Sequence, residues 1–293
     1  MIKIGILGYT DGNGHPYSYS SIFNGYNNEG MKKCPFKTIP EYLNNHKSEN
    51  ERISGAQITH IWTQDYETSN TIANAANILN VVDDPEKMIG EIDGVILARD
   101  DYESHLDIAR PFIEAGINIF IDKPIAISVK KAQKILNLEK FNGQIFTSSC
   151  LAYDPNVIDA KKNLSKIGNI KYIYGSAPGS WNNYAIHLID CLMKIFQNNL
   201  SIKNKNFDNY ETVSVLSATI ENDALLKIAC MGGLNSPLKL TIVGEKGFFD
   251  IDFADPYDAF KNTLEHFLKS IIDKKVIRTH EEILKSISFI EID

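Results

Sequence analysis

Two short segments of the chain carry side chains whose types and spacing suit acid–base chemistry. Asp122-Lys123-Pro124 follows an apolar segment, and a lysine held there by the proline can bind an oxygen and help to move its proton. His187 and Asp190 are three residues apart in the segment NNYAIHLIDCLMKIF, so a helix would place them on one face. A neutral imidazole oriented by a neighbour is a suitable base for an alcohol. Together the segments predict proton transfer at a substrate oxygen, with Lys123 and His187 as catalytic groups.

Each of these residues also has a purely structural interpretation. Lys123 could be a surface lysine in a turn, and His187 could be a core histidine bonded to Asp190. The elements that position the two residues therefore decide between the interpretations.

The first half of the chain alternates short apolar segments with amphipathic ones. Strands are expected over residues 2–8, 56–63, 81–82, 93–98, 118–121 and 144–148. Helices are expected over residues 17–26, 69–79, 84–89, 105–115 and 128–140. The sequence between residues 27 and 55 is polar and irregular. This alternation is typical of a doubly wound parallel sheet, the Rossmann-type fold.

The carboxyl ends of such strands form the ligand-binding edge of the sheet. In this chain the segments at that edge are Gly8–Pro16, Thr63–Asp65, Ala98–Asp101 and Asp122–Pro124. Because Lys123 falls in one of them, the fold favours a functional role for this lysine.

The second half of the chain has a different order of expected helices and strands. Helices are expected over residues 155–164, 184–196, 257–272 and 281–287, and strands over residues 170–176, 211–220, 224–231, 238–243 and 248–252. Short turns between the strands predict an open, mainly antiparallel sheet with helices on one face. The polar segment Asn198–Asn209 is predicted to be a mobile loop. We therefore expect an α/β protein of two domains, a Rossmann dinucleotide-binding domain over residues 1–149 and a second α/β domain over residues 150–293.

The chain resembles the glucose-fructose oxidoreductase and inositol dehydrogenase family (Gfo/Idh/MocA). That family carries Glu-Lys-Pro after its fifth strand and a His-x-x-Asp helix opening in its second domain, and this chain has Asp122-Lys123-Pro124 and His187-Leu188-Ile189-Asp190. The order of strands and helices agrees over nearly the whole chain. The resemblance implies an NAD- or NADP-dependent oxidoreductase whose second domain binds substrate. It also implies a homodimer or homotetramer formed through the sheet face opposite the cleft, with Lys123 and His187 facing one pocket.

Two features depart from the family pattern. An acidic residue often stands four positions before the histidine, whereas this chain has Asn183, which can bind a hydroxyl but cannot take its proton. The first loop lacks G-x-G-x-x-G, because Thr10 stands at the second glycine position after Gly8, and Gly12 and Gly14 suggest a longer turn. The loop either contacts a cofactor or is an ordinary flexible connection.

The cofactor's phosphate state stays open. Thr63 stands where an NAD site usually offers an acidic residue to the ribose, yet no arginine stands beside it for NADP. Arg99 either pairs with a phosphate or substrate carboxylate, or forms a salt bridge with Asp100 or Asp101. The expected cofactor contacts are Gly8, Thr10, Gly12, Gly14, Thr63, Arg99, Lys123 and Pro124.

Composition limits the partners. The formal net charge of −7 gives no general case for nucleic acid, which prefers a basic face. The four cysteines are far apart and lack zinc-site spacing, so we expect no metal and reduced thiols in the cytoplasm. The sequence holds no apolar run of the roughly 18 residues that a membrane span needs, and no signal-peptide pattern, so no membrane partner is expected.

The sequence thus predicts an NAD(P)-dependent oxidoreductase acting on a hydroxyl or ketone of a sugar, cyclitol or nucleotide-sugar. Lys123 would polarise the oxygen, His187 would shuttle its proton or orient the sugar, and Asn183 would bind a neighbouring hydroxyl. One alternative is a family scaffold that has lost redox activity and binds a sugar or nucleotide. Another is an enzyme that uses transient oxidation for elimination or glycoside hydrolysis.

Overall fold

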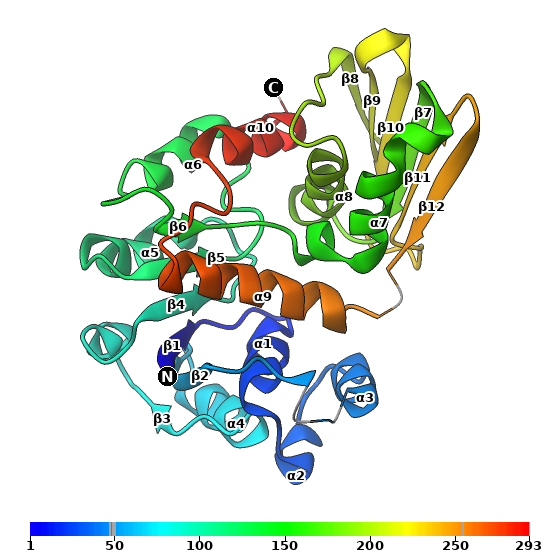
Figure 1. The fold of residues 1–293 in the computed structure, drawn as a ribbon. Coiled ribbons are helices and arrows are strands. Elements are labelled where there is room, and N and C mark those ends of the chain that lie inside the picture. The colour runs from blue at the N-terminus through cyan, green and yellow to red at the C-terminus, as the bar shows by residue number, and fades with distance from the viewer. Residues whose placement is uncertain (47, 49–50, 254, 293) are drawn as a thin grey trace. The chain divides into compact units, whose positions relative to one another are not determined.

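The computed structural model describes residues 1–46, 48, 51–253 and 255–292 (Figure 1). The chain divides into two compact units. The first unit consists of Met1–Ala126, Lys130–Thr147 and Phe260–His280. The second consists of Ile127–Val129, Ser148–Ala259 and Glu281–Asp293. A C-terminal segment, Phe260–His280, belongs to the first unit, so neither unit is continuous along the chain. The predicted domain boundary at residues 149 and 150 stays a prediction.

The first unit is built on a parallel sheet. Its described strands, in sheet order, are β3 (Asn80–Val81), β2 (Ala56–Trp62), β1 (Ile2–Leu7), β4 (Gly94–Leu97), β5 (Asn118–Ile121) and β6 (Ile145–Phe146). Every neighbouring pair is parallel. The order reverses between β1 and β4, which is the switch point at which doubly wound sheets bind ligands. The predicted fold class is confirmed.

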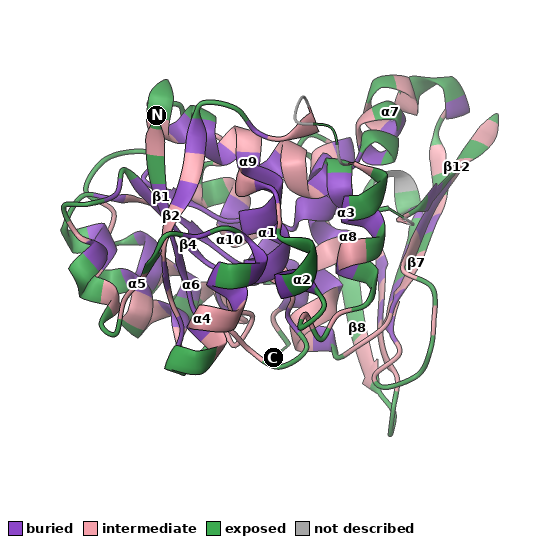
Figure 2. Ribbon diagram, turned by 90° about the horizontal axis from the view of Figure 1, so that it is seen from below, coloured by how far each residue is buried: buried purple, intermediate pink, exposed green. Residues whose placement is uncertain are grey.

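The central strands of this sheet are buried on both faces. Ile4 and Ile6 of β1 and Val95 and Ile96 of β4 have no exposed surface, and Figure 2 shows β4 and most of β1 in the colour of buried residues. Continuous apolar runs of this kind are typical of parallel strands covered by helices on both sides.

Helices connect and cover these strands. They are α1 (His15–Asn24), α2 (Asn28–Met31), α3 (Thr38–Asn45), α4 (Tyr66–Ala75), η2 (Pro85–Met88), α5 (His105–Glu114), α6 (Val129–Leu136) and α9 (Tyr257–Ile272). Phe120 of β5 packs against Tyr19 of α1 and Phe267 of α9, so these two helices cover the same face of the sheet. Right-handed crossovers place α1 and α5 on opposite faces, since β2 and β5 lie on opposite sides of the switch point.

The second unit is built on a mixed sheet. Its described strands, in sheet order, are β12 (Gly247–Asp252), β11 (Lys239–Gly244), β7 (Ile170–Ala177), β10 (Leu225–Cys230), β9 (Ser214–Thr219) and β8 (Lys203–Asn209). The β10–β7 pair is parallel and the other pairs are antiparallel, as predicted for a mainly antiparallel sheet. The turn between β11 and β12 falls at the expected residues, where Gly244 pairs with Gly247.

One face of the second sheet is covered by helices. They are η3 (Cys150–Tyr153), α7 (Pro155–Asn163), η4 (Leu164–Ile167) and α8 (Trp181–Ile195), with η5 (Glu221–Asp223) between β9 and β10 and α10 (His280–Ile290) near the C-terminus. Leu188 of α8 lies against Gly175 of β7, where an added Cβ would come within 3.0 Å of it. Ile173, Leu226 and Ile242 face the same side and are fully buried.

Two polar segments differ from expectation. The predicted mobile loop Asn198–Asn209 contains β8, which pairs with β9 at the edge of the sheet. Edge strands often carry charged and polar side chains, because only their backbone has to pair. The irregular region after residue 27 contains α2 and α3, and Asn27 caps α2 by accepting hydrogen bonds from the backbone of Glu29 and Gly30.

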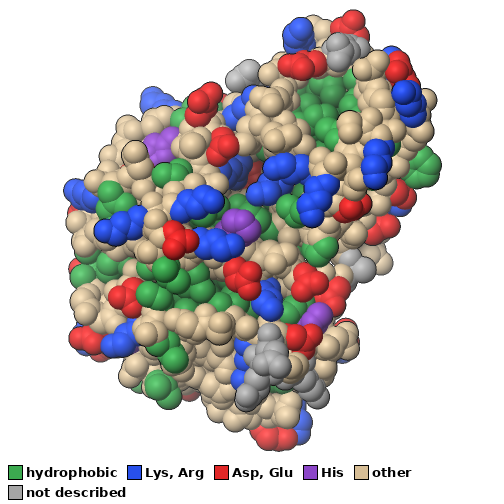
Figure 3. All heavy atoms as spheres, viewed as in Figure 1, with side chains coloured by type: hydrophobic (Ala, Val, Ile, Leu, Met, Phe, Trp, Pro, Cys, Tyr) green, Lys and Arg blue, Asp and Glu red, His purple; other side chains and the backbone are tan. Residues whose placement is uncertain are grey.

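The cysteines and the surface agree with the compositional analysis. All four cysteines are free thiols, and Cys150, Cys191 and Cys230 are buried. Basic and acidic side chains are interspersed on the face shown in Figure 3. Among the helices described, none combines the length and apolar character needed to cross a bilayer.

Candidate functional site

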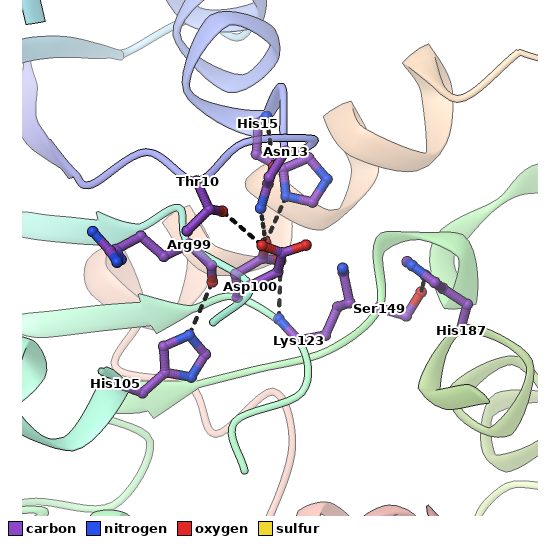
Figure 4. Close-up of polar contacts among 10 residues, drawn as sticks. Thr10, Asn13, His15, Arg99, Asp100, His105, Lys123, Ser149 and His187 are labelled. Carbon is purple, nitrogen blue, oxygen red and sulfur yellow. Dashed lines mark hydrogen bonds and ion pairs between the residues drawn. The ribbon is translucent and has the colours of Figure 1, made fainter. Parts of the chain in front are cut away.

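The carboxyl ends of β1, β4 and β5 carry a cluster of polar side chains within the first unit (Figure 4). At its centre, Asp122 follows β5 and is only 1% exposed. Its carboxylate accepts hydrogen bonds from Asn13 Nδ2 at 3.0 Å, His15 Nδ1 at 2.7 Å and the backbone nitrogen of Lys123 at 2.9 Å. A buried carboxylate is stable only when such donors replace water.

The ionisation of Asp122 follows from this environment. Burial alone would raise the pKa of Asp122, but the charges of His15 and Lys123 and the hydrogen bonds hold the pKa well below its usual range. Asp122 is therefore a carboxylate at neutral pH and acts only as an acceptor.

Lys123 lies beside this carboxylate. The lysine is 5% exposed, and its charge acts on Asp122. Pro124, which follows it, is also buried. A lysine buried at the carboxyl end of β5 differs from the surface lysine of the structural interpretation, because lysines are seldom buried without a specific partner. Its predicted catalytic role stays a prediction.

His15 is the first residue of α1. Its ring stacks on Tyr19 of the next helical turn, with centroids 4.6 Å apart, and meets the edge of Phe260 at 5.5 Å. Pro16 follows it in the first turn of the helix. Proline suits this position because backbone N–H groups there have no partner within the helix, so the N–H that proline lacks is not needed. The ring is thus held between aromatic side chains while its Nδ1 atom faces Asp122.

The loop before α1 contains the predicted glycine positions. Gly8 has a φ of +81°, and a Cβ on it would lie 2.2 Å from Arg99 Cδ, so only glycine fits there. Gly12 is exposed, and a Cβ added to it would meet only open space. Gly14 instead approaches Ile39 and Phe36, so it permits packing inside the unit.

Thr10 and Arg99 both have acidic partners. The Thr10 hydroxyl donates to Asp100 at 2.6 Å. Arg99 donates to both carboxylate oxygens of Asp101, at 2.7 and 2.5 Å, which is the ion pair considered from the sequence. Burial alone would raise the pKa of Asp101, yet the hydrogen bonds and charge of Arg99 lower it.

His105 connects the loops after β4 and β5. Its side chain is fully buried, with Nε2 2.9 Å from the Arg99 carbonyl oxygen and Nδ1 3.2 Å from that of Ile125. The sequence indicated only that a helix begins near this histidine. The structure shows that it fixes the backbone on both sides of the site.

Thr63 closes the turn after β2. Its side chain is buried, and its hydroxyl donates to the Asp65 carbonyl at 2.6 Å and lies 2.9 Å from the Ser69 hydroxyl. Asp65 caps α4 by accepting from the Thr68 backbone at 2.7 Å. Hydrogen bonds from the side chain and the backbone of Thr68 lower the pKa of Asp65. The predicted contact of Thr63 with a cofactor stays a prediction.

In the second unit, α8 carries Asn183 and His187, both half-buried. His187 Nδ1 lies 2.7 Å from the Ser149 hydroxyl, and Asp190 accepts from the Ser149 backbone nitrogen at 2.7 Å. His187 and Asp190 therefore meet through Ser149, a residue that the sequence did not single out. Nothing in the spacing of residues 149 and 187 could have indicated this contact.

A cavity of about 540 Å³ lies elsewhere in the second unit. It is lined at the carboxyl end of α8 by Phe196 and Gln197 and on α7 by Lys161 and Lys162. His187 and Asn183 are not among its lining residues, so the predicted site residues do not line this cavity. Within the described part of the chain, no group of three or more acidic, histidine or cysteine side chains could hold a metal ion.

The residues around the first sheet fit a dinucleotide in part. Gly8 makes a tight turn after β1, and a Cβ at this position would occupy the space beside the backbone that a ligand could approach. The α1 N-terminus has glycine as its capping residue and no acidic residue in its first turn. However, the His15 backbone N–H donates to the Asn13 side chain and Pro16 has no N–H, so this helix end offers few backbone donors to a phosphate. Asp100 and Asp101 are less favourable neighbours for an anion, although Thr10 and Arg99 pair with them.

Comparison with known proteins agrees with this fit. Residues 39–149 match the family model GFO_IDH_MocA, described as an oxidoreductase family with an NAD-binding Rossmann fold. This match covers less than half of the chain, most of it in the first unit. The match agrees with the predicted resemblance, and the family that it describes is one of oxidoreductases with an NAD-binding Rossmann fold.

Solved structures share the fold over almost the whole chain. A putative myo-inositol dehydrogenase from Sinorhizobium meliloti 1021 has a TM-score of 0.74 and 13% identity, covering 99% of this chain and 95% of that one. Scyllo-inositol dehydrogenase from Lactobacillus casei, with bound NAD(H) and scyllo-inositol, has a TM-score of 0.73 and 16% identity, with the same coverage of 99% and 95%. Myo-inositol 2-dehydrogenase from Lactobacillus plantarum has a TM-score of 0.76 and 13% identity, again covering 99% and 95%. At these identities the likeness establishes the fold alone. A search of curated proteins found no match.

Proposed function

We propose that this chain is an NAD(P)-dependent dehydrogenase or reductase acting on a hydroxyl or ketone of a cyclitol or sugar. The observation that carries the proposal is Lys123, which is 5% exposed at the carboxyl end of β5 in a Rossmann unit. An ammonium in that place can stabilise negative charge on a substrate oxygen, and such stabilisation is stronger where water is excluded. Cyclitols are the first substrates to test, because similar solved structures carry inositol dehydrogenase names.

The proposed roles divide between binding and proton transfer. A bound nicotinamide dinucleotide would supply the acceptor or donor of hydride. Gly8 and the α1 N-terminus would hold its phosphates, with Thr10, Arg99 and Pro124 as further contacts.

Lys123 would stabilise the charge that develops on the substrate oxygen as its proton leaves. Asn183 would bind a neighbouring hydroxyl through its amide. His187, whose Nδ1 lies against the Ser149 hydroxyl, would orient the sugar or carry the proton. These assignments make Lys123 the group on which turnover depends most.

A second candidate function is a redox-inactive scaffold that binds a sugar or nucleotide. Asp100 and Asp101 favour it, because they bring two carboxylates to the loop region where a dinucleotide phosphate would lie. Titration of the full chain with NADH and with NADPH, followed by fluorescence, separates the two functions. Saturable binding of either supports the enzyme, whereas no binding up to millimolar concentration supports the scaffold.

Product analysis separates redox from elimination or hydrolysis. The full chain would be incubated with NAD⁺ or NADP⁺ and a panel containing myo-inositol, scyllo-inositol and glycosides. A ketone formed together with NADH or NADPH supports the dehydrogenase. An unsaturated or hydrolysed product without net cofactor reduction supports the lyase or glycosidase alternative.

We also propose that the chain forms a homodimer or homotetramer through the uncovered face of the second sheet. Tyr174, Leu225 and Phe248 lie on that face and are 43%, 51% and 66% exposed. Exposed apolar side chains gathered on one sheet face are typical of an interface. Analytical ultracentrifugation of the wild type and of Phe248→Lys tests it, because a monomeric wild type would contradict the proposal.

We also propose that the protein is located in the cytoplasm. Its four free thiols fit a reducing compartment. Fractionation of the native cells, with the chain detected by antibody, would place it there or contradict the proposal.

A further inference from the structure

The first unit contains an Asp–His pair that the proposed function does not use. His15 Nδ1 lies 2.7 Å from Asp122 Oδ2, and the side chains of the two residues are 16% and 1% exposed. The pair spans 107 residues of sequence and joins the start of α1 to the end of β5. It therefore lies at the ligand-binding edge of the Rossmann sheet, next to Lys123.

The chemistry of the pair follows from which atom carries the proton. The carboxylate of Asp122 can only accept, so the contact requires a hydrogen on His15 Nδ1. In the neutral imidazole, Nε2 then has a free lone pair. Among the described residues, no hydrogen bond is made by this Nε2 atom, and the side chain retains some exposure to solvent. This arrangement of carboxylate, Nδ1–H and free Nε2 is the one that general bases use.

The surroundings hold the pair in place. Asn13 and the Lys123 backbone donate to the same carboxylate, and the Asn13 side-chain oxygen accepts from the His15 backbone at 2.9 Å. The imidazole ring is fixed between Tyr19 and Phe260. A ring fixed in this way loses little freedom when it acts, which is a requirement for efficient proton transfer.

The charged groups around His15 come from several elements. The loop after β5 supplies Asp122 and Lys123, the loop after β4 supplies Asp100 bonded to Thr10, and the loop before α1 supplies the exposed Asp11. The contacts from α1 and α9 are the aromatic rings of Tyr19 and Phe260. The buried carboxylate is thus the anion in direct contact with the imidazole.

We propose that His15, oriented by Asp122, is the base that takes the proton of the substrate hydroxyl. This inference rests on the proposed function. The substrate O–H bond breaks and an N–H bond forms at His15 Nε2. The two electrons of the neighbouring C–H bond leave as hydride to the oxidised nicotinamide dinucleotide, and a carbonyl forms. Lys123 remains an ammonium that stabilises the oxygen.

The first part of the test needs neither substrate nor cofactor. The full chain is labelled with ¹⁵N-histidine, and NMR at a pH where His15 is neutral reads its tautomer, with His15→Gln identifying its signals. We expect the Nδ1–H form in the wild type and loss of that preference in Asp122→Asn. An Nε2–H form in the wild type overturns the inference, whatever the turnover.

The second part measures turnover and cofactor binding. We expect His15→Ala to lower kcat at least on the order of a hundredfold, in the range of general-base catalysis, with NADH affinity unchanged. Added imidazole should restore part of the rate, which a merely structural role would not allow. His46→Gln is the matched control, since His46 also pairs with a carboxylate, Glu51, at 3.2 Å.

The outcomes separate this inference from the proposed function. Normal turnover by His15→Ala overturns the base role and leaves the dehydrogenase intact. A wild type that binds neither NADH nor NADPH and oxidises nothing overturns the proposed function and the base role together. Imidazole rescue combined with the Nδ1–H tautomer supports both.

Discussion

The two candidate imidazoles of this chain lie in contrasting chemical settings. In the first unit, His15 Nδ1 faces the buried carboxylate of Asp122, whereas in the second unit His187 Nδ1 faces the hydroxyl of Ser149. A carboxylate stabilises the positive charge that an imidazole acquires with a proton, and a neutral hydroxyl does so much less. On the proposed function, we assign the proton transfer to His15 and the orientation of the substrate to His187. The hydrogen-bonded cluster around Asp122 lies at the edge of the first sheet.

The largest effect expected from this contrast is on turnover in Lys123→Met. Removing a preorganised positive charge from a developing oxyanion costs on the order of a hundred- to a thousandfold in kcat. Lys134→Met on α6 is the control, since Lys134 is exposed in the same chain. Steady-state rates with the cyclitol panel check this, and equal rates for the two variants would remove Lys123 from the mechanism.

The second effect concerns the stability contributed by Asp122. Its pKa is held below the unfolded value of about 3.9, so its contribution is complete above that pH and is lost as the pH falls through the lower folded value. Asp122→Asn should lower the free energy of unfolding by about 3 kcal/mol at pH 7, because a charged acceptor of buried hydrogen bonds is lost. The difference from wild type should shrink below about pH 4.

Urea titrations at pH 7, 5 and 3.5 measure this difference. A constant difference at all three pH values would mean that the Asp122 carboxylate is not stabilised by His15 and Lys123.

A smaller effect distinguishes the two predicted uses of Arg99. If Arg99 leaves Asp101 to bind a phosphate, Arg99→Gln should weaken NADH binding about tenfold, equivalent to about 1.4 kcal/mol. Arg110→Gln, on the exposed side of α5, is the control. Fluorescence titration that gives the same affinity for both variants would leave Arg99 with its Asp101 ion pair alone.

The smallest effect belongs to the second unit. Ser149→Ala removes a neutral hydroxyl from His187 and should cost about 1 kcal/mol in unfolding free energy, with less than about a tenfold change in kcat. Thermal denaturation and steady-state kinetics measure the two. A fall in kcat as large as that of Lys123→Met would reverse the contrast drawn between the imidazoles.

Much of the fold could be predicted because its signals are local. Each of the strands β1, β4 and β5 is a short apolar run, so its signal lies within a few consecutive residues. β8 was missed because its side chains, KNKNFDN, do not alternate, and pairing with β9 overrides that polarity. The return of Phe260–His280 to the first unit depends on contacts such as Phe267 with Phe120, which no local pattern encodes.

The candidate site was predictable only in part, for the same reason. The position of Lys123 follows from strand order, since the carboxyl ends of parallel strands share one edge. The partners of Asp122 come from a loop more than a hundred residues earlier, as the 107-residue separation from His15 shows. Ser149 likewise reaches His187 only through folding. Long-range pairing of this kind leaves no spacing signal in one sequence.

The central claim is that a nicotinamide dinucleotide binds at the edge of the first sheet that carries Gly8, His15 and Lys123. A crystal structure of the full chain with NAD(H) tests it most directly. We predict the phosphates over the Gly8–Gly14 loop and the nicotinamide ring beside Lys123, with His15 Nε2 facing the same space. A dinucleotide bound elsewhere, or with its nicotinamide turned away from Lys123, would contradict the account.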